Sequence, residues 1–199
     1  MTIDDIFDSV IVANRGVNLE TFEKVIHLAV ELAREGREGR KIGALFVLGD
    51  HEEVLARSRA LILDPLLYHP ASDKQIQTHN MWETVKELAQ LDGAFVVSDA
   101  GVVVSACRYI DASSKGVELA LGLGSRHMAA ASITKETEAV AVVVSESAIV
   151  RVFDDGELVS EIIPELLLLK RYGLHLEEPY TQRMAEGMTV VSKQVAILD

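Results

Sequence analysis

Several residue types and patterns are scarce in this 199-residue chain, and each scarcity excludes a class of protein. The single cysteine, Cys107, rules out an intramolecular disulfide and is typical of proteins in a reducing compartment. No apolar run approaches the ~20 residues that a membrane-spanning helix requires. The first residues carry no basic region or signal-peptide pattern. We therefore expect a cytoplasmic protein with no membrane partner.

Positive charge is also scarce, with 19 basic against 31 acidic residues and a net charge of -12 at pH 7. Proteins that wrap DNA or RNA present clustered cations, whereas Glu35 and Glu38 interrupt the densest basic stretch, residues 34–41. We therefore expect no nucleic-acid partner. A free nucleotide is different, because a few local donors and a metal ion can outweigh an acidic background.

Aromatic residues make up 5% of the chain, while hydrophobic residues make up 49% and the mean hydropathy is +0.20. These values predict an aliphatic, strand-rich core. A chain of this length is long enough for one ordinary core and short for two. We therefore expect a single domain over residues 1–199, with a core over about 19–169 and a C-terminal extension over 174–199.

The hydrophobic pattern alternates between helical and extended segments. It predicts helices over 19–34, 73–90 and 125–134, capped by Asn18, Ser72 and Ser125, and a short helix from Pro164 to about Gly173. Strands are expected over 42–48, 94–97, 102–107, 139–145, 148–153 and 158–163. Residues 54–63 read as partly extended, and 190–191 with 195–198 as one added strand or a subunit contact.

Two features of these strands predict the architecture. Hairpin spacing favours antiparallel pairing, and fully apolar strands favour a sheet that is covered on both faces. We therefore expect an α/β (α+β) fold with a central mixed, largely antiparallel β-sheet and helices on both faces.

A carboxylate and a glycine stand at the mouth of the strand over 94–97, in the segment Leu91-Asp92-Gly93-Ala94. Aspartate and glycine are both uncommon in strand interiors, so their position directly before a strand is unusual. Taken alone, the segment is more typical of an ordinary helix-to-strand turn. A carboxylate at such a place could also hold a divalent metal ion.

A second segment, Gly124-Ser125-Arg126-His127, opens a predicted helix. Small residues before a helix let backbone amides approach a phosphate, and Ser125 could cap the helix or bond an oxygen. Arg126 could fork onto a phosphate, and His127 could add a second donor. A capped helix with a surface Arg-His pair is the equally supported alternative.

Together the two segments resemble the diadenylate cyclase (DAC) domain family, in which an Asp-Gly-Ala motif and an Arg-His-Arg motif flank the active site. The likeness covers roughly Leu19 to Leu169 and includes the strand segment over 42–45. Two positions depart from the pattern. Met128 stands where the family has its second arginine, and Leu91 where some members have a metal-binding histidine.

The resemblance implies a cytoplasmic, archaeal-style or stand-alone enzyme that condenses two ATP molecules into cyclic di-AMP (c-di-AMP) and two pyrophosphates with Mg²⁺ or Mn²⁺. It assigns catalysis to Asp92, Arg126 and His127, and metal binding to Asp92 and Glu146. The implied ATP contacts are Gly93, Ala94, Tyr109, Gly124, Ser125, Arg126 and His127. Since each domain holds one ATP, the resemblance also implies self-association into a face-to-face dimer or higher assembly.

Two other classes of function stay open at this point. A non-catalytic nucleotide- or c-di-AMP-binding regulatory module would keep the pocket without turnover, and Met128 supports it because one cation is missing. A purely structural subunit explains the fold but not the motifs. The sequence contains no Walker motif, dinucleotide fingerprint, serine-hydrolase motif or zinc-ligand spacing.

Overall fold

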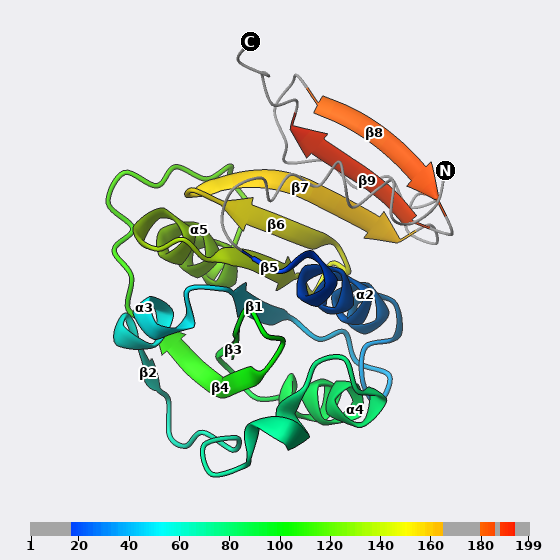
Figure 1. Ribbon diagram of the computed structural model, residues 1–199. Helices are drawn as coiled ribbons and strands as arrows, with labels where there is room; N and C mark the ends of the chain where they lie inside the picture. The colour runs from blue at the N-terminus through cyan, green and yellow to red at the C-terminus, as the bar shows by residue number, and fades with distance from the viewer. Residues whose placement is uncertain (1–16, 165–179, 186–187, 194–199) are drawn as a thin grey trace.

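The structure is a computed structural model that describes residues 17–164, 180–185 and 188–193 (Figure 1). Its centre is a nine-stranded sheet in the order β2-β4-β3-β1-β5-β6-β7-β9-β8. Among the described strands, β1 and β3 pair in parallel and the other neighbours pair antiparallel. The strands are β1 (Ala44–Leu48), β2 (Ser58–Ala60), β3 (Ala94–Val97), β4 (Val103–Ile110), β5 (Val140–Val144), β6 (Val150–Asp154), β7 (Glu157–Pro164), β8 (Tyr180–Ala185) and β9 (Met188–Lys193). The predicted mixed, largely antiparallel sheet is confirmed.

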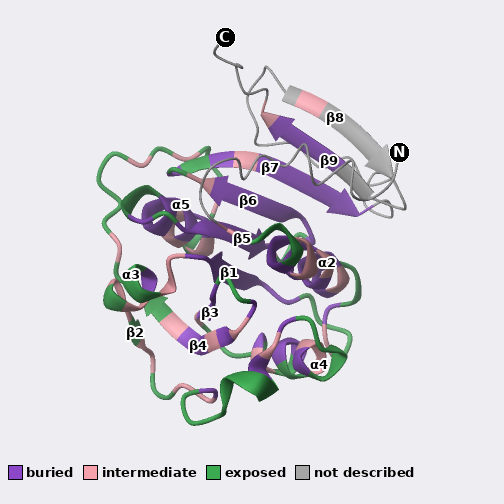
Figure 2. Cartoon of the chain, in the orientation of Figure 1, coloured by how far each residue is buried: buried purple, intermediate pink, exposed green. Residues whose placement is uncertain are grey.

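Helices cover both faces of the sheet, as the apolar strands predict. The helices are α2 (Leu19–Glu35), α3 (His51–Ala56), the 3-10 helix η1 (Ala71–Lys74), α4 (His79–Leu88) and α5 (Ser125–Glu136). Successive side chains of a strand point to opposite faces, so β1 serves two cores. Its Phe46 and Leu48 pack with α2 and α4, whereas Leu45 and Val47 pack with α3 and α5. The resulting central strands are buried (Figure 2).

Helix α2 begins where the sequence predicts, because the Asn18 carboxamide oxygen accepts a hydrogen bond from the Thr21 amide at 3.1 Å. The predicted helix over 73–90 is wrong in its first turns. The Ile76 amide donates to the Gly101 carbonyl at 2.8 Å, which holds this segment beside the chain entering β4. As a result, α4 begins at His79 with Thr78 as its cap instead of Ser72.

Of three other segments, 54–63 and 190–191 agree with the prediction and the segment that begins at Pro164 differs from it. Residues 54–63 form the end of α3 and the short strand β2. Pro164 ends β7, paired with Met188, and the rest of the predicted helix to Gly173 lies outside the described residues. Residues 190–191 belong to an added strand, β9, while 195–198 also lie outside the described residues. In the described ranges, no helix combines the length and the apolarity needed to cross a bilayer.

Candidate active site

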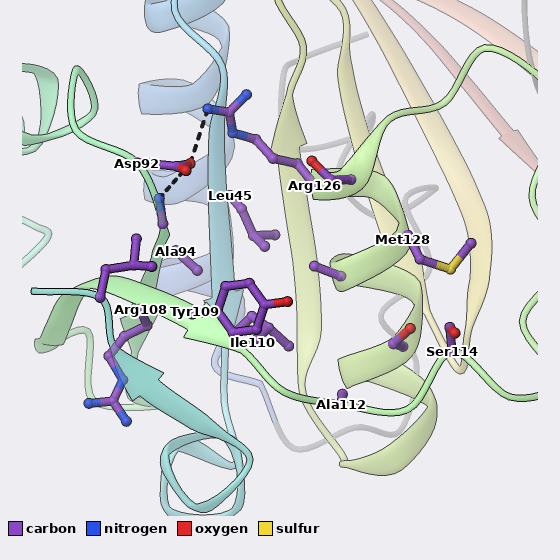
Figure 3. Close-up of a pocket in the computed structure, with 15 residues that line it drawn as sticks. Leu45, Asp92, Ala94, Arg108, Tyr109, Ile110, Ala112, Ser114, Arg126 and Met128 are labelled. Atoms are coloured by element: carbon purple, nitrogen blue, oxygen red, sulfur yellow. Dashed lines mark hydrogen bonds and ion pairs between the residues drawn. The ribbon is translucent and has the colours of Figure 1, made fainter.

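A cavity of about 330 Å³ lies between α5 and the strands β1, β3 and β4 (Figure 3). The helix contributes residues 125, 126, 128, 129 and 132, so one helical stripe forms this wall. The sheet and its loops form the remainder, with lining residues Leu45, Leu61, Asp92, Gly93, Ala94, Arg108, Tyr109, Ile110, Ala112 and Ser114. The cavity therefore brings together the two sequence segments that carry chemistry.

Asp92 stands at the cavity mouth because the chain turns sharply at Gly93. Gly93 has φ 106°, and a Cβ there would lie 2.6 Å from the Cys107 carbonyl carbon. Both observations require glycine. The Gly93 amide donates to Asp92 Oδ1 at 2.9 Å, and the Asp92 side chain is 83% exposed. The carboxylate is thus oriented by the backbone but open to a ligand.

A bulge in β4 accounts for the close approach to Gly93. Ala94 pairs with Arg108 and Val96 pairs with Ser105, so β4 holds one extra residue between these pairs. Cys107 takes a left-handed conformation there, with φ 54°. Burial, followed by the charges of Asp64 and Asp92, raises the pKa of the Cys107 thiol. The thiol is therefore a neutral core group.

Arg126 lies between two carboxylates. Its Nη2 is 3.6 Å from Asp92 Oδ1 and its Nη1 is 3.7 Å from Glu146 Oε1. Both distances exceed a normal hydrogen bond, and both carboxylates are largely exposed, so the guanidinium is weakly held. Figure 3 shows Arg126 reaching from α5 toward Asp92.

Gly43, just before β1, makes room for this arginine. A Cβ at Gly43 would lie 2.6 Å from Arg126 Nη1 and 3.1 Å from its Cζ. The sequence pattern indicates Gly43 only as part of the strand segment over 42–45 and does not indicate its part in the site. A glycine directly before the apolar run of β1 is the signal that could have found it.

Glu146 lies at the β5–β6 hairpin tip, outside the cavity lining but against Arg126. The Ser145 amide donates to the Ile149 carbonyl at 3.0 Å, and the Ala148 amide donates to the Ser145 carbonyl at 2.8 Å. Ala148 has φ 63°, which completes the tight turn. The turn projects the Glu146 side chain outward, where it is 75% exposed.

His127 does not line the cavity, so a direct phosphate contact does not fit this geometry. Its ring is buried, with 7% exposure, and its Nδ1 accepts a hydrogen bond from the Gly124 amide at 3.2 Å. Its Nε2 lies 3.3 Å from Arg151 Nη1. Arg151 in turn pairs with Glu161 at 2.6 Å, in a buried ion pair. His127 therefore holds the start of α5 in place through its buried ring, which accepts the hydrogen bond from Gly124.

The first turn of α5 presents Ser125 to the cavity, while Gly124, instead of Ser125, is the N-cap. The first amides of any helix have no acceptor within the helix, and they favour an anion. Gly124 is exposed at this end but is not part of the cavity lining. Met128 lines the cavity one turn further on and is partly buried.

Tyr109 and Arg108 form the wall contributed by β4. The Arg108 guanidinium donates to the carbonyls of Leu55 and Ser58, at 3.2 and 2.7 Å, so it ties α3 and β2 to the sheet. The Tyr109 side chain faces α5 in Figure 3. The Arg59 guanidinium carbon lies 4.7 Å from the centre of the Tyr109 ring, in a cation–π contact that helps to hold the ring in place.

The donor set at the mouth fits a divalent ion that is shared with a ligand. Mg²⁺ is commonly bound by one or two carboxylates together with substrate phosphates, and Asp92 and Glu146 supply two open carboxylates. Within the described ranges, no group of three or more acidic, histidine or cysteine side chains is placed to hold a metal. A protein-only metal cage therefore does not occur in this part of the chain.

Comparisons with known proteins agree with the sequence resemblance. The model of the DAC family, described as DisA bacterial checkpoint controller nucleotide-binding, matches residues 31–158. A diadenylate cyclase of Methanocaldococcus jannaschii is 48% identical over 150 residues, which cover 75% of this chain and 47% of that protein. A diadenylate cyclase of Haloferax volcanii is 43% identical over 156 residues, with coverages of 77% and 55%. The chain thus spans about half the length of the curated relatives it matches.

A solved structure supports the fold. The chain is similar to a hypothetical membrane spanning protein from Bacillus cereus with a TM-score of 0.51 and 23% identity, over 70% of this chain and 62% of that one. The residues at the cavity mouth, Asp92, Arg126 and Glu146, all lie inside the range that the family model matches.

Proposed function

Since this chain belongs to the diadenylate cyclase (DAC) domain family, we propose that it condenses two ATP molecules into c-di-AMP and two pyrophosphates. The observation that carries this proposal is the placement of Arg126 between Asp92 and Glu146, at the mouth of a cavity of about 330 Å³. Acidic and basic groups that share one opening suit a triphosphate with its counterion. The curated relatives, which are archaeal diadenylate cyclases, support the same reaction.

The reaction makes two demands on the protein. Each 3'-hydroxyl attacks the α-phosphorus of the other nucleotide, loses its proton and displaces pyrophosphate, so two bonds form and two break. The protein must align each hydroxyl with its target phosphorus and stabilise the charge on the departing pyrophosphate. Neither demand requires a covalent enzyme intermediate.

The residues of the cavity divide these tasks. Arg126 exchanges its long carboxylate contacts for charge-assisted hydrogen bonds to phosphate oxygens, and Ser125 with the first α5 amides adds further donors. Gly93 leaves room for the ribose, and Tyr109 offers its ring to the base. His127 acts indirectly, because it holds the Gly124 backbone at the start of α5.

Asp92 and Glu146 are the residues that would hold Mg²⁺ or Mn²⁺ beside the phosphates. When bound, the ion supplies charge neutralisation and lowers the pKa of a coordinated hydroxyl. Asp92 is exposed, so its carboxylate can turn toward the ion. Water can then replace the carboxylate as the acceptor of the Gly93 amide.

One cavity holds one nucleotide, so the productive species requires two copies that face each other. A 3'-hydroxyl within one cavity cannot reach its own α-phosphorus to close a two-nucleotide ring. We therefore propose that the protein self-associates with two-fold symmetry.

The test is incubation of the protein with ATP and Mn²⁺ or Mg²⁺, followed by mass analysis for c-di-AMP and pyrophosphate. We expect both products in a ratio of about one to two, as the reaction's stoichiometry requires, and neither product with Asp92→Asn as the matched control. A wild-type sample that is saturated with ATP and self-associated, yet releases no c-di-AMP, would refute the proposal.

Met128 favours a second candidate, a regulatory module that binds a nucleotide or c-di-AMP without turnover. It lines the cavity where the family's second motif carries a cation, so one phosphate partner is replaced by a thioether. Tight c-di-AMP binding combined with no product from ATP would support this candidate over the enzyme.

A further inference from the structure

Ser132 on α5 is a buried serine whose side-chain oxygen has no hydrogen-bond partner among the described residues. Its exposed fraction is 2%, yet it contributes to the cavity wall. The oxygen itself is buried, so a ligand atom reaches it only when the hydroxyl turns toward the cavity that the residue lines. Buried hydroxyls nearly always have a partner, so an orphan at a cavity wall points to a ligand atom. Two threonines of the same helix end show the usual behaviour, since Thr134 and Thr137 donate to backbone carbonyls at 3.0 and 2.7 Å.

The position of Ser132 along the helix indicates which part of a nucleotide it meets. Ser125 and Ser132 lie on the same stripe of α5, seven residues apart, which is about 10 Å of helix. Ser125 and Arg126 mark the phosphate end of the cavity. In Figure 3, Ala112 and Ser114 lie beside the later turns of α5, away from Arg126. A nucleotide with its phosphates at the start of α5 therefore extends its base toward Ser132.

We propose that the Ser132 hydroxyl hydrogen-bonds the polar edge of the nucleobase and contributes to base selection. A hydroxyl both donates and accepts, so it can pair with an exocyclic amino group or with a ring nitrogen of a purine. A site built around such a bond discriminates against an analogue without the partner, because a buried polar group then stays unpaired. This inference rests on the nucleotide site of the proposed function, but not on turnover.

The test combines stability and binding of Ser132→Ala, with Ser72→Ala as the matched control, because Ser72 is exposed and lies outside the cavity. Without nucleotide, Ser132→Ala should melt at the same temperature as wild type or higher, because the change removes an unpaired buried hydroxyl. With ATP, its affinity should fall about 3- to 10-fold, and its ATP-induced rise in melting temperature should shrink. Ser72→Ala should match wild type in both measurements.

Base analogues locate the bond. We expect wild type and Ser132→Ala to bind inorganic tripolyphosphate equally. At least one purine triphosphate that lacks a single polar group, such as the 6-amino group or N7, should bind both proteins equally. Equal ATP affinity of wild type and Ser132→Ala, or the same loss with tripolyphosphate as with ATP, would overturn the inference.

These outcomes separate the inference from the proposed function. If wild type binds ATP without forming c-di-AMP and Ser132→Ala weakens that binding, the enzyme proposal fails and the inference stands. If wild type forms c-di-AMP and Ser132→Ala binds every nucleotide as wild type does, only the inference fails. If wild type binds no nucleotide, both are overturned.

Discussion

Replacing Gly43 with alanine tests how closely Arg126 must be placed. The new Cβ would lie 2.6 Å from Arg126 Nη1, where an ordinary contact begins at 3.4 Å, so the guanidinium must move by roughly 0.8 Å or more. The atom that is displaced is the far end of a flexible side chain, and the Gly43 backbone does not have a positive φ. The substitution should therefore disturb the site without disturbing the fold.

The expected effects on stability and rate differ in size. The contacts of Arg126 with Asp92 and Glu146 are long and exposed, and such pairs contribute about 0–1 kcal/mol, so the free energy of unfolding should change by no more than that. Misplacing a substrate-positioning group by about 1 Å can cost up to 100-fold in rate. We expect c-di-AMP formation by Gly43→Ala to fall about 10- to 100-fold, or about 1.4–2.7 kcal/mol of transition-state stabilisation.

A double-mutant cycle shows whether this loss acts through Arg126. Rates of c-di-AMP formation, measured by chromatography, and urea unfolding curves are compared for wild type, Gly43→Ala, Arg126→Ala and the double variant. Once Arg126 is removed, Gly43→Ala should have little further effect on the rate. Full activity of Gly43→Ala, or an equal loss in both backgrounds, would refute this reasoning.

The remaining predictions concern a metal ligand, assembly and a thiol. Asp92→Asn should abolish c-di-AMP formation with its melting temperature nearly unchanged, because the carboxylate is exposed; near-normal product would remove Asp92 from the mechanism. On dilution, specific activity should fall while ATP binding per chain persists, as sedimentation and assays on the same samples would show; constant activity of a monomer contradicts the two-copy site. The raised pKa of the Cys107 thiol makes the unfolded chain lose its thiol proton first, above about pH 8.5. The stability of wild type relative to Cys107→Ala should therefore decrease as pH rises from 8 to about 10 in urea unfolding, and parallel pH curves would contradict this.

Local signals predicted most of the fold. The Asn18 cap and the apolar stripe of α2 act within a few residues, and β1 is apolar on both faces because both are covered. The start of α4 was missed because a tertiary contact overrides a local one. The bond from Ile76 to the Gly101 carbonyl keeps residues before Thr78 out of the helix, and no local pattern records that bond.

The residue types of the candidate site can be predicted from the sequence, but the directions in which their side chains point cannot. Asp92 and Arg126 meet as the motifs suggest, whereas His127, adjacent to Arg126 in sequence, points into the protein. Neighbouring residues of a helix face different sides, so one motif supplies both a ligand-facing and a buried residue. The role of Gly43 depends on an arginine far along the chain, and only the three-dimensional contact reveals it.

The bulge in β4 gives the strand one extra residue without changing which of its later side chains face the cavity. Ala106 and Cys107 are adjacent in sequence, yet both pack in the core shared with α2 and α4. This repetition absorbs the extra residue, so Arg108 is opposite Ala94 and both line the cavity. Removing either Ala106 or Cys107 would restore regular pairing, with Ser105 still opposite Val96 and Arg108 still opposite Ala94, so the later side chains of β4 would keep their faces. The bulge therefore matters for the close approach of the Cys107 backbone to Gly93, and its loss would relax the requirement for glycine there without changing which β4 side chains face the cavity.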